Sequence, residues 1–175
     1  MRRIGWQLPV VIAIGMVTWV AIGPVVAAIP ALYVAAVAPE LTRFDLTQHR
    51  LPNRLVVPGL IVGVLAAAGS WLTTGHPPLV PLIAAAAYGG VLFVLAIGGG
   101  MGMGDVKLAA VLGLASPTSV IAIASPLLAF TLGGVVALVV LIVRGRGSRI
   151  AFGPFLLAGF VGALAAAAVL RAAIL

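Results

Sequence analysis

Residues 79–97 read LVPLIAAAAYGGVLFVLAI, an apolar run without a charged side chain. An α-helix that crosses the hydrocarbon core of a bilayer needs about 20 mainly apolar residues. Comparable runs lie on both sides of this one, and a shorter helix is expected from Asp105. The spans that this pattern predicts are residues 6–23, 25–41, 55–73, 79–97, 120–143 and 150–170. The sequence therefore predicts an all-α, polytopic transmembrane bundle of six or seven helices.

Composition places the whole chain in the membrane class. Of its 175 residues 63% are hydrophobic and 7% are charged, whereas soluble domains are roughly 45–50% apolar and about 25% charged. No polar stretch is long enough for a separate soluble domain, so we expect residues 1–175 to form one membrane-embedded domain. The N-terminus could instead be a signal peptide, but its apolar stretch runs on to Ala38, which favours a retained first helix.

The net charge of +7 comes from basic residues in small groups between the apolar runs. No basic face with interleaved aromatics occurs, so nucleic acid is not an expected partner. With seven crossings and a cytoplasmic N-terminus, every basic residue except Arg171 falls on the cytoplasmic side, as the positive-inside rule requires. A six-helix count moves only the N-terminus outside. The chain has no cysteine, which excludes thiolate sites, and neither a metal nor a cofactor is predicted.

Only three acidic residues occur, namely Glu40, Asp45 and Asp105. An acid at the centre of a membrane helix costs about 2.5–3.5 kcal/mol, so its presence suggests a function. Asp45 follows the second span, and Asp105 follows the glycine-rich residues 98–104, which are not expected to form a regular helix. Both lie at cytoplasmic ends of helices and can meet if those helices pack.

Each acid also has a plainer explanation. Asp45 could be an interfacial residue paired with Arg43 or Arg50, and Asp105 could be the N-cap of its helix. Glu40 is expected to be a solvated residue at a helix end, without a catalytic role. If the two aspartates do meet at one water, one carboxylate can accept a proton from the water while the other polarises a carbonyl group. A proton-coupled transporter or channel and a noncatalytic scaffold remain alternatives.

Three segments carry a resemblance to a known family. They are Gly102-Met103-Gly104-Asp105, Asp45 with the downstream Leu51-Pro52-Asn53, and Phe152-Gly153-Pro154-Phe155. In this order the chain resembles the type IV prepilin peptidases, the membrane aspartic proteases with a GxGD motif. The resemblance covers roughly residue 24 to the C-terminus, so residues 1–23 look like an additional helix. No methyltransferase segment with paired cysteines is seen, so N-methylation is not expected.

The resemblance implies a function and a set of site residues. Asp45 and Asp105 would be the catalytic pair of an aspartic endopeptidase in the inner (plasma) membrane. The substrates would be prepilins or pseudopilins of type IV pili or secretion systems, cleaved on the cytoplasmic side after a short basic leader. The residues expected to bind substrate are Gly102, Gly104, Pro52, Asn53 and Lys107. Oligomeric state is not predicted.

Overall fold

A computed structural model describes residues 7–22, 26–99, 101–145 and 151–174. Seven α-helices and one 3-10 turn make up this part of the chain, which contains no strand. The elements are α1 Gln7–Ile22, η1 Val26–Ala28, α2 Ile29–Gln48, α3 Asn53–Thr74, α4 Leu79–Ile97, α5 Met103–Leu114, α6 Ser119–Arg144 and α7 Gly153–Ile174. The all-α prediction is confirmed. Five of the helices, α2 (with η1), α3, α4, α6 and α7, are long and apolar enough to cross a membrane.

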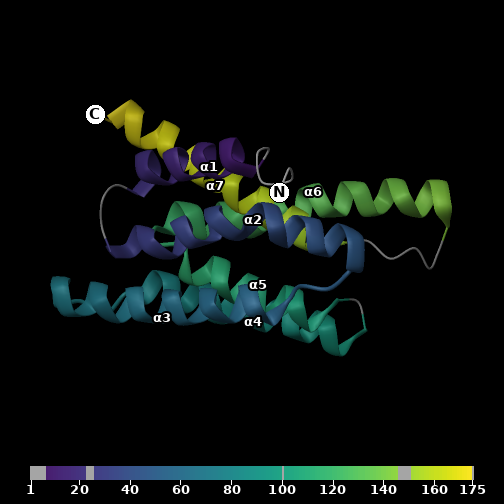
Figure 1. Ribbon diagram of the computed structural model, residues 1–175, viewed down its shortest axis with the longest axis horizontal. Coiled ribbons are helices and arrows are strands. Elements are labelled where there is room, and N and C mark those ends of the chain that lie inside the picture. Colours follow the sequence, from purple (N-terminus) through teal and green to yellow (C-terminus); the bar gives the residue numbers. More distant parts are fainter. Residues whose placement is uncertain (1–6, 23–25, 100, 146–150, 175) are drawn as a thin grey trace.

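The long helices run back and forth along one axis (Figure 1). The α2–α3 connection, the end of α4 and the start of α7 lie toward the right of Figure 1, whereas the α1–α2 and α3–α4 connections and the C-terminal end of α7 lie toward the left. We call the right-hand end, which holds the last turn of α2 and the first turns of α3, α5 and α7, the site end. Both aspartates lie at the site end.

The short helix α5 packs between α3 and α4 through small residues. A Cβ on Gly113 would lie 2.4 Å from the backbone of Ala85, and a Cβ on Gly63 would lie 2.7 Å from the Leu114 side chain. The helix has 12 residues, so at about 1.5 Å per residue it is about 18 Å long and cannot cross a core of about 30 Å. Beyond its C-terminal end a cavity of about 700 Å³ opens among η1, α3 and α4.

The core of the bundle lies where α2, α5 and α7 face one another, with Leu41, Leu112 and Phe160 almost fully buried. Large apolar side chains elsewhere point outward, among them Leu72 on α3, which is 87% exposed, and Ile142 on α6, which is 75% exposed. A soluble protein rarely leaves so much apolar surface uncovered. These outward faces fit contact with lipid, in agreement with the predicted membrane class.

The predicted end of the second span, at residue 41, is wrong. Helix α2 continues through Pro39 to Gln48 and carries Asp45 in its last turns. Proline removes one hydrogen bond from a helix, but Pro39 is buried within α2 and the helix goes on beyond it. Asp45 is therefore held on a helix and not in a loop.

The start of α5 also differs from the prediction. The helix begins at Met103, so part of the glycine-rich stretch is helical, and its N-cap is Gly102. Asp105 is the third residue of the helix and not its cap. The explanation of Asp105 as an N-cap is therefore wrong, and capping does not account for an acid at this position.

Candidate functional site

Asp45 receives a hydrogen bond from a distant part of the chain. Its side chain is buried, with 4% exposed, and Oδ2 accepts a hydrogen bond of 2.8 Å from the backbone N–H of Gly153, the first residue of α7. The first N–H groups of a helix have no partner within the helix, so this one is free to bind the carboxyl group. A Cβ at position 153 would lie 2.7 Å from Oδ2, so the contact needs glycine.

Asp105 lies in a different environment. Its Oδ1 is buried and has no hydrogen-bond partner among the residues that the structure describes. The pKa of Asp105 is raised to about 6, mainly by burial and also by the charge of Asp45, while the backbone of Gly102 opposes part of the rise. The influence of Asp45 means that the two carboxyl groups lie close enough to interact. Such a pair can share one proton, because both members ionise together only at a high cost.

Leu51 links the two helix starts that flank the aspartates. A Cβ on Gly104 would lie 2.9 Å from the Cβ of Leu51, and a Cβ on Gly153 would lie 3.5 Å from its Cδ2. The absence of a side chain at Gly104 thus makes room for Leu51. Gly102, by contrast, is exposed, and the nearest atom to its missing Cβ is Oδ2 of Asp105, at 3.4 Å.

The remaining predicted site residues lie beside this contact. Pro52 is the N-cap of α3, and Asn53, the next residue, accepts a hydrogen bond of 2.9 Å at Oδ1 from Nζ of Lys107. This bond ties the start of α3 to the first turns of α5. The structure therefore brings the predicted substrate-binding residues together at the site end. Their contact with a substrate stays a prediction.

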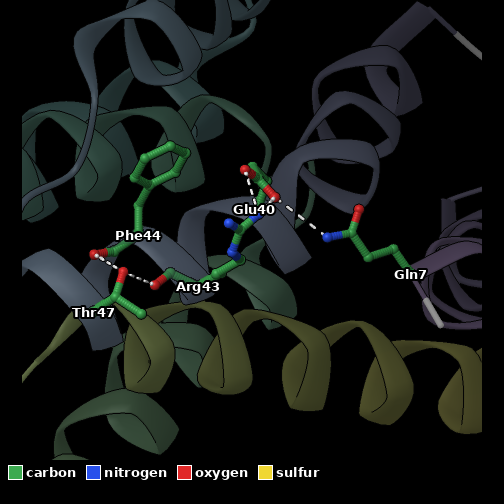
Figure 2. Close-up of polar contacts among 5 residues, drawn as sticks. All are labelled: Gln7, Glu40, Arg43, Phe44 and Thr47. Carbon is green, nitrogen blue, oxygen red and sulfur yellow. Dashed lines mark hydrogen bonds and ion pairs between the residues drawn. The ribbon is translucent and has the colours of Figure 1, made fainter. Parts of the chain in front are cut away.

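Glu40 and Arg43 pair with each other (Figure 2). An Arg43 Nη1 lies 3.3 Å from Oε1 of Glu40, and Nε2 of Gln7 donates a bond of 3.2 Å to Oε2 of Glu40. Glu40 lies within α2 and not at a helix end, so that expectation is wrong. Its contact with Gln7 joins α1 to α2.

Three cations of the site end are bound to other residues than the aspartates. The guanidinium carbon of Arg54 lies 5.1 Å from the centre of the Phe44 ring, Lys107 binds Asn53, and the one ion pair in the described ranges is Arg43 with Glu40. The explanation of Asp45 as the ion-pair partner of Arg43 or Arg50 is therefore wrong. In the described part of the chain, neither aspartate carboxyl group has a cation bound to it to neutralise its charge.

Sequence reasoning missed the part of the site that comes from α7. The segment Phe152-Gly153-Pro154-Phe155 carries part of the family resemblance, but nothing in its composition indicates that the N–H of Gly153 reaches Asp45. The contact joins residues 108 positions apart. A glycine followed by proline at the start of a helix is the only local signal, because proline is common in a first turn.

Comparison with known proteins gave one match. A model of the type IV leader peptidase family matches residues 31–167. The match covers both aspartates and all of the residues discussed above except Gln7, and α1 lies before it. No curated protein and no solved structure gives a significant match.

Proposed function

The chain belongs to the type IV leader peptidase family, and from this premise we propose that it is an aspartic endopeptidase in which Asp45 and Asp105 form the catalytic pair. The observation that carries the proposal is the placement of the two carboxyl groups at one end of the bundle, where the charge of Asp45 acts on Asp105. The two residues are 60 positions apart in sequence, and they are the only aspartates in the chain. The third acid, Glu40, is already bound to Arg43 and Gln7.

The chemistry needs one ionised and one protonated carboxyl group. The carboxylate accepts a proton from water as the water oxygen attacks the peptide carbonyl, and the carboxylic acid gives its proton to the carbonyl oxygen. The tetrahedral intermediate then collapses as the C–N bond breaks, with a proton passing to the leaving amine. A peptide acid and a free amine result, and the pair again holds one proton. Burial and the nearby second acid both favour such a shared proton.

We propose that the substrates are prepilin-like or pseudopilin-like precursors. Their apolar helix would lie in the bilayer beside the bundle, with the basic leader at the site end. Gly102 is exposed next to Asp105, and a glycine without a Cβ allows a substrate backbone to approach closely. Pro52, Asn53 and Lys107 would form the rim. Gly104 would act indirectly, by making room for Leu51.

A basic leader would meet several cations at the site end, which at first disfavours this substrate. Arg43, Arg54 and Lys107 are each held by another residue of the chain. Of these three, only Arg43 is paired with an opposite charge, that of Glu40, so its repulsion of an incoming positive charge is reduced. Near the scissile bond, the negative charge of the aspartate pair would attract the basic leader and offset repulsion by the cations.

We propose that the site end faces the cytoplasm and that the chain lies in the plasma membrane. Support comes from Arg43, Arg50, Arg54 and Lys107, which all lie at that end, whereas Arg171 lies near the opposite end of α7. Lys and Arg are enriched in cytoplasmic loops. The transporter alternative is not favoured, because the matching family consists of peptidases and both acids lie at the same end of the bundle.

The proposal is tested by cleavage in proteoliposomes. The substrate is a synthetic precursor with a short basic leader, a glycine and an apolar helix, and the product is identified by mass. Asp45→Asn and Asp105→Asn should each lower the rate by about 10²-fold or more, since general acid–base catalysis contributes 10²–10⁴-fold. Glu40→Gln is the matched control and should retain activity. Full activity in either aspartate variant would overturn the proposal.

A further inference from the structure

We infer that the two aspartates have fixed and different roles, with Asp45 as the ionised base that activates water, Asp105 as the acid that protonates the carbonyl oxygen, and Gly153 as the positioning residue that sets this order. The inference rests on the proposed function. It adds an assignment that the family match does not contain. The experiment below separates its failure from failure of the proposed function.

The first observation is the hydrogen bond at Asp45. Oδ2 accepts the N–H of Gly153 at 2.8 Å. A backbone N–H cannot accept a hydrogen bond from a carboxylic acid, and its donation favours the charged form of the carboxyl group. Asp45 thus has a fixed donor that stabilises its negative charge, and the bond orients the other oxygen, Oδ1.

The second observation is the buried oxygen of Asp105. Oδ1 has no donor in the described part of the chain, so a negative charge there is poorly compensated. A proton on Asp105 removes that charge and makes the group a hydrogen-bond donor, which is what an acid in the reaction must be. Burial, the largest cause of the raised pKa of Asp105, acts in the same direction.

Helix termini do not distinguish the two acids. Asp45 faces the first residue of α7, and Asp105 lies in the first turn of α5. Asp45 also lies in the last turn of α2, whose dipole opposes a negative charge there, so helix termini do not favour ionisation of Asp45 over that of Asp105. The difference that does favour it is the N–H of Gly153 bound to Asp45 and the unpartnered Oδ1 of Asp105.

Among the nearby basic residues, only His49 acts on one of the aspartates, and its charge favours the ionised form of Asp45. The basic residues at the site end of α2, α3, α5 and the α2–α3 loop are Arg43, His49, Arg50, Arg54 and Lys107. Three of them are bound elsewhere, as described above, while His49 and Arg50 are exposed at the end of α2 and beyond it. The basic residue described on α7, Arg171, is in the last turn of that helix, far from Gly153. In the described part of the chain, none of their side chains binds either aspartate carboxyl group.

The composition of the chain allows a direct test. Because Asp45 and Asp105 are the only aspartates, labelling with aspartate carrying ¹³C at the side-chain carboxyl gives two signals, which Asp45→Asn and Asp105→Asn assign. In a pH titration of the full protein in lipid, the Asp45 signal should change to that of a carboxylate at a lower pH than the Asp105 signal. Titration in the reverse order, or of both groups together, would overturn the inference.

The role of Gly153 is tested in the same experiment. In Gly153→Ala the new Cβ would lie 2.7 Å from Oδ2 of Asp45 and displace the carboxyl group from the N–H. The titration of Asp45 should then move upward by about one pH unit, since a hydrogen bond to a charged group is lost. The pH profile of cleavage should move with it. Gly134→Ala is the control, because no atom lies within 4 Å of a Cβ at that position. It should change neither the titration of Asp45 nor the pH profile of cleavage.

Several outcomes distinguish failure of the assigned roles from failure of the proposed function. If both aspartates are required for cleavage but Asp105 loses its proton first, the division of roles is wrong and the proposed function stands. If neither aspartate is required, the proposed function itself fails. If the titration of Asp45 is unchanged in folded Gly153→Ala, the role of Gly153 as a positioning residue is wrong.

Discussion

The backbone N–H of Gly153 donates a hydrogen bond of 2.8 Å to Oδ2 of Asp45, across 108 positions of sequence. The bond fixes the start of α7 against the last turns of α2. It also makes position 153 intolerant of a side chain, since a Cβ there would lie 2.7 Å from the same oxygen. The carboxyl group is thereby held at the place where α2, α5 and α7 meet.

Cleavage should depend on pH through Asp105. Burial and the charge of Asp45 raise the pKa of Asp105 from 3.8 to about 6, so this group keeps its proton to a higher pH than an ordinary aspartate. The proposed acid is present below about pH 6 and is lost above it. In reconstituted protein, kcat/KM should fall by about tenfold per pH unit on the alkaline side. A rate that rises with pH through this range would contradict the assignment.

Gly104→Ala should disturb the site through Leu51. The new Cβ would lie 2.9 Å from the Cβ of Leu51, which the loop before α3 must relieve by moving. Overpacking of this kind costs about 1–3 kcal/mol, so both the melting temperature in detergent and the cleavage rate should fall. A second change, Leu51→Gly, removes the Cβ that the new methyl group meets and should restore part of the loss. Loss of activity that Leu51→Gly does not relieve at all would speak against the packing role.

The bond between Lys107 and Asn53 should behave as one unit. Lys107→Met and Asn53→Ala each break the same 2.9 Å hydrogen bond between α5 and α3. The double variant should therefore raise KM for the precursor about as much as either single variant, with a coupling energy of about 1 kcal/mol or less because the pair is at the surface. Effects that multiply in the double variant would show that the two side chains act separately.

The close packing of α5 against α4 should be sensitive to one methyl group. In Gly113→Ala the Cβ would lie 2.4 Å from the backbone of Ala85, and backbone cannot move aside as a side chain can. We expect a loss of about 1–3 kcal/mol in stability, measured by thermal unfolding in detergent. Gly90→Ala on α4 meets no atom within 4 Å and should leave the melting temperature unchanged. Equal stability of the two variants would contradict this packing.

The membrane helices could be predicted well because hydrophobic length determines them. The span expected over residues 79–97 is the helix Leu79–Ile97, since apolar length and flanking turn residues are local properties. The end of α2 could not be predicted, because Pro39 is tolerated only in the packed bundle. The start of α5 at Met103, two residues before the expected Asp105, could not be predicted for a similar reason. Glycine disfavours a helix locally, whereas tertiary contacts stabilise this one.

Within the site, the residue types were predictable and their contacts were not. Only three acidic residues occur in this chain, so Asp45 and Asp105 could be identified as candidates from the sequence alone. The bond from Gly153 and the position of Leu51 between two helix starts depend on how α2, α5 and α7 pack. Such contacts leave no periodic pattern in a single sequence, so only the three-dimensional structure identifies them.

The central claim is that the side chains of Asp45 and Asp105 meet, and cross-linking tests it most directly. The chain has no cysteine, so Asp45→Cys with Asp105→Cys introduces the only two thiols. A short bifunctional thiol reagent applied to membranes should link them, as it should link the positive control Asn53→Cys with Lys107→Cys, whose native side chains touch. Efficient linkage of the aspartate positions is the result that the account predicts. Linkage of the control pair without linkage of the aspartate pair would contradict it.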